Sequence, residues 1–297
     1  VKINMNTIIV RALAKINLAI DVLRRKEDGY HEIDMVAIPL ELHDSIEITP
    51  FPPNSRLDTY LYCDDPTIIC DESNLAYKAL NLMKNHHRIE GAFQMMIHKR
   101  IPVEAGLGGG SADAAAVIRA LDNYRKEKEV ELEITEEKIA LECGADVPFC
   151  IKNKPCRVRG IGERLDEIKI KNKYHVLIVR PNIGLSTKDV FEAFDFINQE
   201  EIKHPDIDAL IHALEIGDEQ LMKENMINVL SYPAIKALPQ IKELLDEMTA
   251  KGLDLNGMSG TGSACYALSK DRHKLEIASR QFEAKGYSCF LTSFHLN

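Results

Sequence analysis

The most informative stretch of this chain reads Pro102-Val103-Glu104-Ala105-Gly106-Leu107-Gly108-Gly109-Gly110-Ser111-Ala112-Asp113-Ala114-Ala115. Four glycines within five positions run directly into small residues that are typical of a helix. Glycine permits left-handed backbone angles and close ligand approach, and a helix start presents unpaired N–H donors. Such a loop suits an anion, most naturally a phosphate. Ser111 is the expected N-cap of the helix, and Asp113 suits its first turn.

Two well-known phosphate-binding motifs do not match this loop. The Walker A motif needs Gly-Lys-Ser/Thr at the helix start, whereas Gly110 is followed by Ser111 and Ala112. The dinucleotide fingerprint needs a glycine three places after its second one, and Ser111 stands three places after Gly108. A flexible glycine linker is the alternative interpretation. Linkers do not usually join an apolar strand, expected here at 93–101, to an alanine-rich helix, so the sequence predicts a rigid phosphate-binding loop.

Length and composition are those of an ordinary globular protein. The 297 residues are 45% hydrophobic and 28% charged, which suffices for a substantial core and for two modest domains. The balance of 37 basic and 46 acidic residues gives a net charge of −9, which argues against general binding to nucleic acid or to a membrane surface. No apolar run approaches the roughly 18 residues of a membrane span, and no secretory hydrophobic region stands at the start. We therefore expect a cytoplasmic protein with no nucleic-acid or membrane partner.

The cysteines and histidines give no sign of a metal site. The seven cysteines are odd in number and include no Cys-x-x-Cys pair, so we expect buried or idle thiols in a reducing cytosol. They are Cys63, Cys70, Cys143, Cys150, Cys156, Cys265 and Cys289. The ten histidines show no pair with the i, i+4 spacing that suits zinc on a helix. No metal ligands are expected from the protein.

The order of the expected elements indicates an α+β fold with two domains. The first part combines β-rich segments with helical spacing. Strands are expected at 8–10, 14–22, 33–42 and 46–48, and helices at 74–86, from the loop to about 124, and from Thr135 to the C-cap Gly144. After a basic connector at 169–173 the pattern changes; strands are expected at 176–179, 264–268 and 289–292, and helices at 239–251 and 274–285. We place one domain at 1–168 and the other at 169–297.

Three further segments carry side chains that suit chemistry. In the strand at 14–22, alternation puts Lys15 and Asn17 on the face opposite the aliphatic residues, where they either form a solvated polar face or meet a partner. Asp146 enters an apolar segment with a proline, so it should be partly buried and need a cation or several donors, unless it is a turn or capping aspartate.

The third segment, Tyr30-His31, follows a turn and offers a ring and an imidazole to a flat heterocycle, although an interior tyrosine and a surface histidine would be equally unremarkable. A second glycine-rich turn stands at 257–264 and leads into a strand. It either approaches a ligand phosphate or simply makes a tight bend, and we favour the ligand.

These segments, in this order, resemble the GHMP kinase superfamily of small-molecule kinases. That family carries a lysine strand near its N-terminus, a P-x-x-x-G-L-G-G-G-S-A loop that opens a helix, and a late glycine turn, and all three stand here at suitable separations. Within it, the segment 14–32, with Asp28-Gly29-Tyr30-His31-Glu32, and the segment 144–148 are similar to the branch that acts on a cytidine diphosphate-linked methylerythritol. The resemblance covers nearly the whole chain.

The resemblance implies a fold and a set of roles. The fold would join an N-terminal domain like ribosomal S5 domain 2 to a ferredoxin-like C-terminal domain, with the active site between them. Lys15 and Asp146 would form the catalytic pair, with Asp146 a general base or an electrostatic organiser. The cofactors would be ATP and Mg²⁺. ATP would be held by Asn74 and Leu75 near the base and by Pro102, Val103, Glu104, Ala105, Gly106, Leu107, Gly108, Gly109, Gly110, Ser111 and Ala112.

The same resemblance implies the substrate side of the site. Substrate would be bound by Asn17, Tyr30, His31, Phe191, Gly260 and Gly262, with the Tyr-His pair and Phe191 on the cytosine. The partner is therefore a small molecule, the chain being a monomer or a weak homodimer. Two rival interpretations remain: another kinase of the superfamily, such as one for homoserine or mevalonate, and a non-catalytic nucleotide or sugar sensor. A sensor could dispense with Lys15 and Asp146, and both stand here.

Overall fold

The computed structural model describes residues 7–128 and 134–296, and these residues form two compact units. Unit 1 contains the described residues up to Ala14, together with His43–Ile101 and Gly108–Asn153. Unit 2 contains Lys15–Leu42, Pro102–Leu107 and the chain from Lys154 onward. Both units mix helices and strands, as an α+β fold requires. Each unit draws on separate stretches of the chain, and the division into domains at 168/169 stays a prediction.

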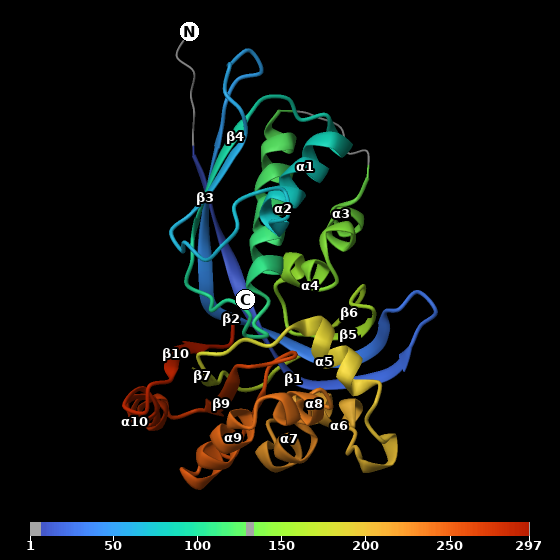
Figure 1. Ribbon diagram of the computed structural model, residues 1–297, viewed down its shortest axis with the longest axis vertical. Helices are drawn as coiled ribbons and strands as arrows, with labels where there is room; N and C mark the ends of the chain where they lie inside the picture. Colours follow the sequence, from blue (N-terminus) through green and yellow to red (C-terminus); the bar gives the residue numbers. More distant parts are fainter. Residues whose placement is uncertain (1–6, 129–133, 297) are drawn as a thin grey trace. The chain divides into compact units, whose positions relative to one another are not determined.

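Unit 1 is a sheet with helices on one side. The second part of β2 (His31–Pro50) pairs antiparallel with β4 (Phe93–His98), where Ile46 stands opposite Ile97, and β3 (Tyr60–Cys63) pairs parallel with β4. Figure 1 shows the four helices of this unit gathered beside these strands. They are α1 (Leu75–His87), α2 (Gly109–Glu127), α3 (Glu136–Cys143) and α4 (Val147–Lys152). Residues 112–118 of α2 are all buried, because their small side chains let neighbouring elements pack closely.

The helix ends of unit 1 follow local capping chemistry. Asn74 is the N-cap of α1 and its Oδ1 accepts a hydrogen bond from Ala76 N at 2.9 Å. Thr135 precedes α3 and Gly144 follows it, which confirms the two expected ends. Ser111 does not cap α2: the helix begins at Gly109 and its N-cap is Gly108. Gly108 adopts a left-handed backbone at φ 71°, and this starts the helix without a side-chain cap. Ser111 therefore does not take the capping role.

Unit 2 is built around a four-stranded antiparallel sheet. Its strand order is β10 (Ser288–Ser293), β7 (His175–Arg180), β9 (Cys265–Ser269) and β8 (Asn256–Met258). The first three lie close to the expected strands, whereas β8 was not predicted. The first part of β2 also pairs here with β5 (Cys156–Gly160), which pairs with β6 (Arg164–Glu167). The helices, visible in Figure 1, are α5 (Thr187–Phe194), α6 (Ile207–Ile216), α7 (Glu219–Asn225), α8 (Ser231–Ala237), α9 (Gln240–Ala250) and α10 (Arg272–Glu283), with a 3₁₀ turn at Gln199–Glu201.

Two long strands replace the four short ones that the sequence predicts. β1 runs without a break over Ile8–Arg25, and β2 runs over His31–Pro50. Polar residues interrupt the alternation of apolar side chains at these places, but the backbone continues because they find partners. The Arg11 guanidinium lies 3.2 Å from His43 Nδ1, and Asp44 accepts a hydrogen bond from Lys99 Nζ at 2.6 Å.

Candidate active site

The lysine of β1 is buried together with its polar neighbour. Lys15 is 5% exposed and Asn17 is 1% exposed, so the interpretation of this face as solvated is wrong. Lys15 Nζ donates to Asn17 Oδ1 at 2.7 Å, and Asn17 Nδ2 lies 3.1 Å from the sulfur of Met35. A buried ammonium is costly unless polar groups compensate it. The two residues are therefore held in fixed orientation rather than moving freely in water.

Backbone hydrogen bonds join this lysine strand to the phosphate-binding loop. Lys15 N donates to Leu107 O at 3.0 Å within unit 2. Gly106 has φ 71°, and a Cβ at that position would lie 2.1 Å from Ser259 O. Only glycine meets both requirements. The loop is therefore rigid at Gly106, as the sequence predicts, and the linker interpretation is wrong.

The start of α2 supplies the donors that an anion would use. In an α-helix the first N–H groups have no partner inside the helix, and here they belong to Gly109, Gly110 and Ser111, whereas Ala112 N donates to Gly108 O at 2.8 Å. Gly110 is exposed, and a Cβ there would meet only Leu75 Cδ1, at 3.6 Å. These residues belong to unit 1, as do Asn74 and Leu75. The helix start has the bare backbone and the dipole that phosphate binding uses.

The second glycine-rich turn packs against the first. Ser259 is fully buried; its Oγ donates to Gly106 O at 2.8 Å and accepts from Asn17 N at 3.4 Å. Gly260 has φ 58°, and a Cβ there would lie 3.0 Å from Gly106 O. The turn thus holds the backbone of the phosphate-binding loop against the lysine strand. Substrate contact by Gly260 and Gly262 stays a prediction.

An aromatic group in unit 2 contains the residues predicted to contact a base. The rings of His31 and Phe191 stack with centroids 4.9 Å apart at 29°. Tyr30 is 57% exposed and offers a free ring face. His31 Nε2 lies 2.7 Å from Asp195 Oδ1, and Arg25 reaches the other carboxylate oxygen at 3.1 Å. Asp195 was not predicted from the sequence, although it follows Phe191 by four positions and so shares its helix face.

Asp146 lies in unit 1, directly before α4. It is half-buried, as expected. Gly144 rather than Asp146 ends α3, so the interpretation of Asp146 as a C-cap is wrong, and Asp146 stands in the turn before α4 without a side-chain capping hydrogen bond. Lys15 belongs to unit 2, and its pairing with Asp146 stays a prediction.

A buried ion cluster supports the start of α2. Lys99 Nζ lies 2.6 Å from Asp44 Oδ2 and 2.7 Å from Asp113 Oδ2, and all three side chains are almost fully buried. Burial raises the pKa of the Asp113 carboxyl to about 7, against the lowering effect of the Lys99 charge. A Cβ at Gly109 would lie 3.1 Å from Lys99 Nζ, so this ammonium lies beside the first residue of α2. Arg100, in contrast, is 65% exposed and reaches Asp64 at 3.5 Å.

The described residues show neither a group of metal ligands nor a helix that could span a membrane. None of the seven cysteines belongs to a disulfide, and among residues 7–128 and 134–296 no three acidic, histidine or cysteine side chains group as a metal site would require. Within the same ranges, every helix is too short or too polar to cross a bilayer.

Comparisons with known proteins match both halves of the chain. Residues 74–154 match the family described as GHMP kinases N terminal domain, and residues 198–288 match GHMP kinases C terminal. A protein of Acetivibrio thermocellus named 4-diphosphocytidyl-2-C-methyl-D-erythritol kinase is 35% identical over 97% of this chain and 99% of its own length. A protein of the same name from Clostridium novyi is 34% identical over 95% of this chain and 98% of its own.

Solved structures give the same result at the level of the fold. A crystal structure of 4-(cytidine 5'-diphospho)-2C-methyl-D-erythritol kinase superposes with a TM-score of 0.79 at 29% identity, covering 98% of this chain and all of that one. Homoserine kinase from Cytophaga hutchinsonii reaches a TM-score of 0.74 at 16% identity over 100% of this chain and 97% of its own, which shows a shared fold alone.

Proposed function

Because the chain belongs to the family of 4-diphosphocytidyl-2-C-methyl-D-erythritol kinases, we propose that it transfers the terminal phosphoryl group of ATP to the 2-hydroxyl of 4-diphosphocytidyl-2-C-methyl-D-erythritol. This reaction is a step of the non-mevalonate route to isoprenoid precursors. One observation carries the proposal at the level of chemistry: the strand of the buried Lys15 is hydrogen-bonded directly to the glycine loop, through Lys15 N and Leu107 O at 3.0 Å. A lysine and a phosphate cradle fixed together are what phosphoryl transfer needs, because it depends on positioning and charge neutralisation.

The phosphates of ATP would be held mainly by backbone N–H groups. Gly106 and Gly108 both take φ 71°, so the loop presents its backbone without side chains in the way. The start of α2 adds further donors and the positive end of the helix dipole. We place the base near Asn74 and Leu75, since Leu75 lies beside Gly110 at the helix start.

Mg²⁺ fits this arrangement as an ion carried on the nucleotide. Magnesium prefers oxygen ligands and commonly keeps several waters while binding substrate phosphates. The exposed backbone around Gly110 leaves room for a hydrated ion beside the phosphates. When bound, Mg²⁺ would neutralise charge on the transferring group.

Lys15 and Asp146 would act on the acceptor hydroxyl. Asp146 would accept the proton as the hydroxyl attacks, and Lys15 would keep the carboxylate ionised and orient the nucleophile. Asn17 holds Lys15 Nζ at 2.7 Å, which limits the positions that the ammonium can take. Convergence of the two side chains is part of the proposal.

The cytosine end of the substrate would meet the aromatic group of unit 2. The stacked pair of His31 and Phe191 and the exposed ring of Tyr30 offer flat faces, and the contact to Asp195 fixes the orientation of the imidazole. Whether a monomer or a weak homodimer, the chain presents all these residues itself.

A panel of acceptors tests the proposed function. Purified protein with ATP and Mg²⁺ is supplied in turn with the cytidine diphosphate substrate, homoserine and mevalonate, and ADP release is measured. We expect rapid release with the first and a rate at least about 10³-fold lower with the others, since a site built for polar groups rejects ligands that lack them. Equal release without any acceptor, or a preference for homoserine or mevalonate, would refute the proposed substrate.

A further inference from the structure

A cavity in unit 2 lies outside the residues assigned above to catalysis. Its volume is about 380 Å³, within the range of about 300–1,000 Å³ typical of small-molecule sites. It is bounded by β1, by the segment 226–232, by α8 and α9, and by the strands β8 and β9. The residues that line it are Leu18, Lys203, Met226, Ile227, Asn228, Ser231, Tyr232, Ile235, Leu245, Asn256, Gly257, Met258 and Tyr266.

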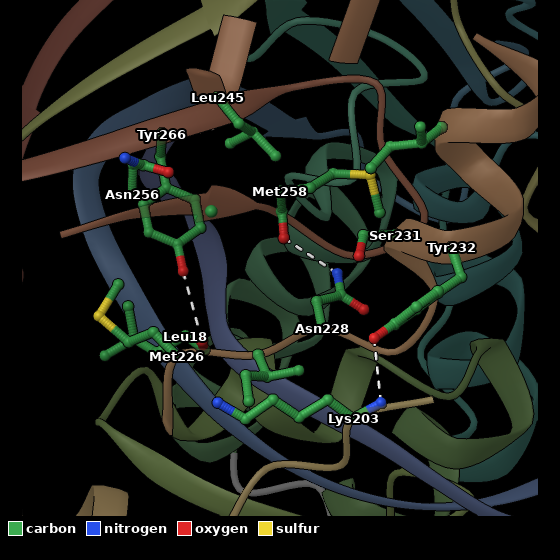
Figure 2. Close-up of a pocket in the computed structure, with 13 residues that line it drawn as sticks. Leu18, Lys203, Met226, Asn228, Ser231, Tyr232, Leu245, Asn256, Met258 and Tyr266 are labelled. Atoms are coloured by element: carbon green, nitrogen blue, oxygen red, sulfur yellow. Dashed lines mark hydrogen bonds between the residues drawn. The ribbon is translucent and has the colours of Figure 1, made fainter. Parts of the chain in front are cut away.

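The lining is apolar apart from a few neutral polar groups and one cation. Leu18, Met258 and Tyr266 are each about 1% exposed, and they form the buried floor of the cavity. Among the residues that line the cavity, Lys203 alone carries a charge. Figure 2 shows Lys203 and Leu245 at opposite ends of the lining residues, with Asn228 and Met258 between them. A ligand with an apolar body and a negative head group matches this distribution.

Asn228 connects the cavity to the glycine-rich turn. Its Nδ2 donates to Met258 O at 2.9 Å, drawn in Figure 2, and to Gly260 O at 2.7 Å. The residue between these two carbonyls is Ser259, whose Oγ donates to Gly106 O at 2.8 Å. The side chain that forms one wall of the cavity therefore also fixes the turn that holds the phosphate-binding loop.

We propose that this cavity is a second binding site, for a small molecule with an apolar body and an anionic head group, and that its occupancy is transmitted to the phosphate-binding loop through Asn228 and Ser259. The apolar body occupies the floor and displaces water there, which drives binding. The head group lies toward the Lys203 ammonium. The effect on nucleotide kinetics rests on the proposed function, whereas binding itself does not.

Three probes of one shape test the ligand class: 4-phenylbutanoate, 4-phenylbutan-1-ol and 4-phenylbutan-1-amine. Calorimetry or ligand-observed NMR on the full chain should rank the acid first and the amine last. Lys203→Gln should weaken the acid about two- to fivefold, the worth of an exposed ion pair, and leave the alcohol unchanged. The matched control is Lys242→Gln, which replaces an exposed lysine of α9. It should change the affinity for neither the acid nor the alcohol. No binding by any probe, or an amine that binds as well as the acid, would overturn the proposal.

Filling the cavity tests its location. Leu245→Trp and Ile235→Phe enlarge two half-buried side chains of the lining, so each should weaken all three probes at least about tenfold. Two positions are used so that, if circular dichroism shows a folding defect in one variant, the other variant still tests the site. If a folded variant still binds the acid as the wild type does, the probe sits elsewhere and the assignment of the site fails.

Nucleotide binding tests the transmission. Saturating 4-phenylbutanoate should change the ATP KM at least about twofold in the wild type and leave it unchanged in Leu245→Trp. A fluorescent ATP analogue gives the same comparison as a binding constant, without any turnover. Binding of the acid with no change in nucleotide affinity would refute the transmission. A chain that binds the acid and shifts nucleotide affinity but phosphorylates no acceptor would refute only the proposed function.

Discussion

At the scale of single residues, burial decides which charged groups can do chemistry. Lys15, Asn17 and Asp113 are almost fully buried, whereas Arg100 and Tyr30 are largely exposed. Each buried group has a partner at short distance, such as Lys15 with Asn17 and Asp113 with Lys99. Lys15 and Asn17 are therefore held in place on β1, where the proposed reaction needs the lysine.

Asp146→Asn tests the proposed acceptor of the proton. The amide keeps the shape of the side chain but cannot take up a proton, so kcat should fall by about 10²–10⁴-fold, the usual contribution of general base catalysis. The affinity for ATP, measured with a fluorescent analogue, should change less than about threefold. The control is Asp58→Asn, an exposed aspartate of the same unit. A variant that turns over at near the wild-type rate would remove Asp146 from the mechanism.

The ion cluster around Lys99 makes the stability of the fold depend on pH. Two carboxylates face one ammonium, Oδ1 of Asp113 has no hydrogen-bond partner among the described residues, and the pKa of Asp113 is raised to about 7. Between about pH 4 and pH 7 the folded chain then keeps a proton that the unfolded chain has released. The contribution of Asp113 to the free energy of unfolding therefore falls as the pH rises through this window.

Asp113→Asn should remove this dependence. The variant leaves Lys99 with Asp44 alone, a matched pair, and its amide does not titrate. In urea unfolding at pH 5, 6, 7 and 8, the free energy of unfolding of the variant should increase relative to that of the wild type up to about pH 7 and then level off. An exposed substitution such as Asp58→Asn should keep the wild-type slope. If Asp113→Asn retains that slope as well, the carboxyl does not hold the proton.

At the scale of elements, the shape of the phosphate-binding loop depends on its contact with a second glycine-rich turn. The loop at 102–107 and the turn at 257–264 meet where Ser259 contacts Gly106. Gly106 and Gly260 carry no side chain where the two segments approach, and this lets the Ser259 hydroxyl reach Gly106 O. The shape of the loop thus depends on close contact between segments about 150 positions apart.

Gly106→Ala tests this contact. The added Cβ would lie 2.1 Å from Ser259 O, and φ 71° is unfavourable for alanine, so the loop must shift. We expect an ATP KM at least about tenfold higher. Gly286→Ala is the matched control, because Gly286 has a similar φ of 88° and open space around it. It should lower the free energy of unfolding by about 1–2 kcal/mol while leaving the KM unchanged. Equal effects of the two substitutions would mean that backbone strain alone is responsible.

The sequence predicts local features of these elements well and long-range pairs poorly. The phosphate-binding loop, Asn74 at the start of α1 and the end of α3 at Gly144 follow from short patterns, because glycine and capping residues act on their neighbours. The ion cluster joins Asp44, Lys99 and Asp113, and no pattern within one segment links them. Arg25 and Asp195 are likewise 170 positions apart.

At the scale of the whole molecule, the loop that is predicted to hold the nucleotide is divided between the two units. The loop residues Pro102–Leu107 belong to unit 2 and the helix start from Gly108 belongs to unit 1. A nucleotide that engages both should stabilise the chain as a whole. The sequence predicts the whole loop within one N-terminal domain at 1–168, so a division within the loop itself is not predicted.

Ligand linkage measures this effect. A non-hydrolysable ATP analogue at 100 times its Kd should add about 2.7 kcal/mol to the free energy of unfolding and raise Tm by a few degrees. Gly106→Ala, with an affinity about tenfold weaker, should lose about half of this gain at the same concentration. Two separate thermal transitions, of which the analogue shifts only one, would show that the nucleotide engages a single unit.

The hydroxyl of Ser259 has a consequence for how the protein matures during synthesis. It lies 153 positions beyond the backbone carbonyl that it contacts, so the ribosome completes the glycine loop long before its support exists. An emerging chain can form the helix start at an early stage, yet the hydrogen bond that fixes the loop can form only after Ser259 has been made. The glycine loop therefore reaches its final shape only after the second glycine-rich turn has been synthesised and has packed against it.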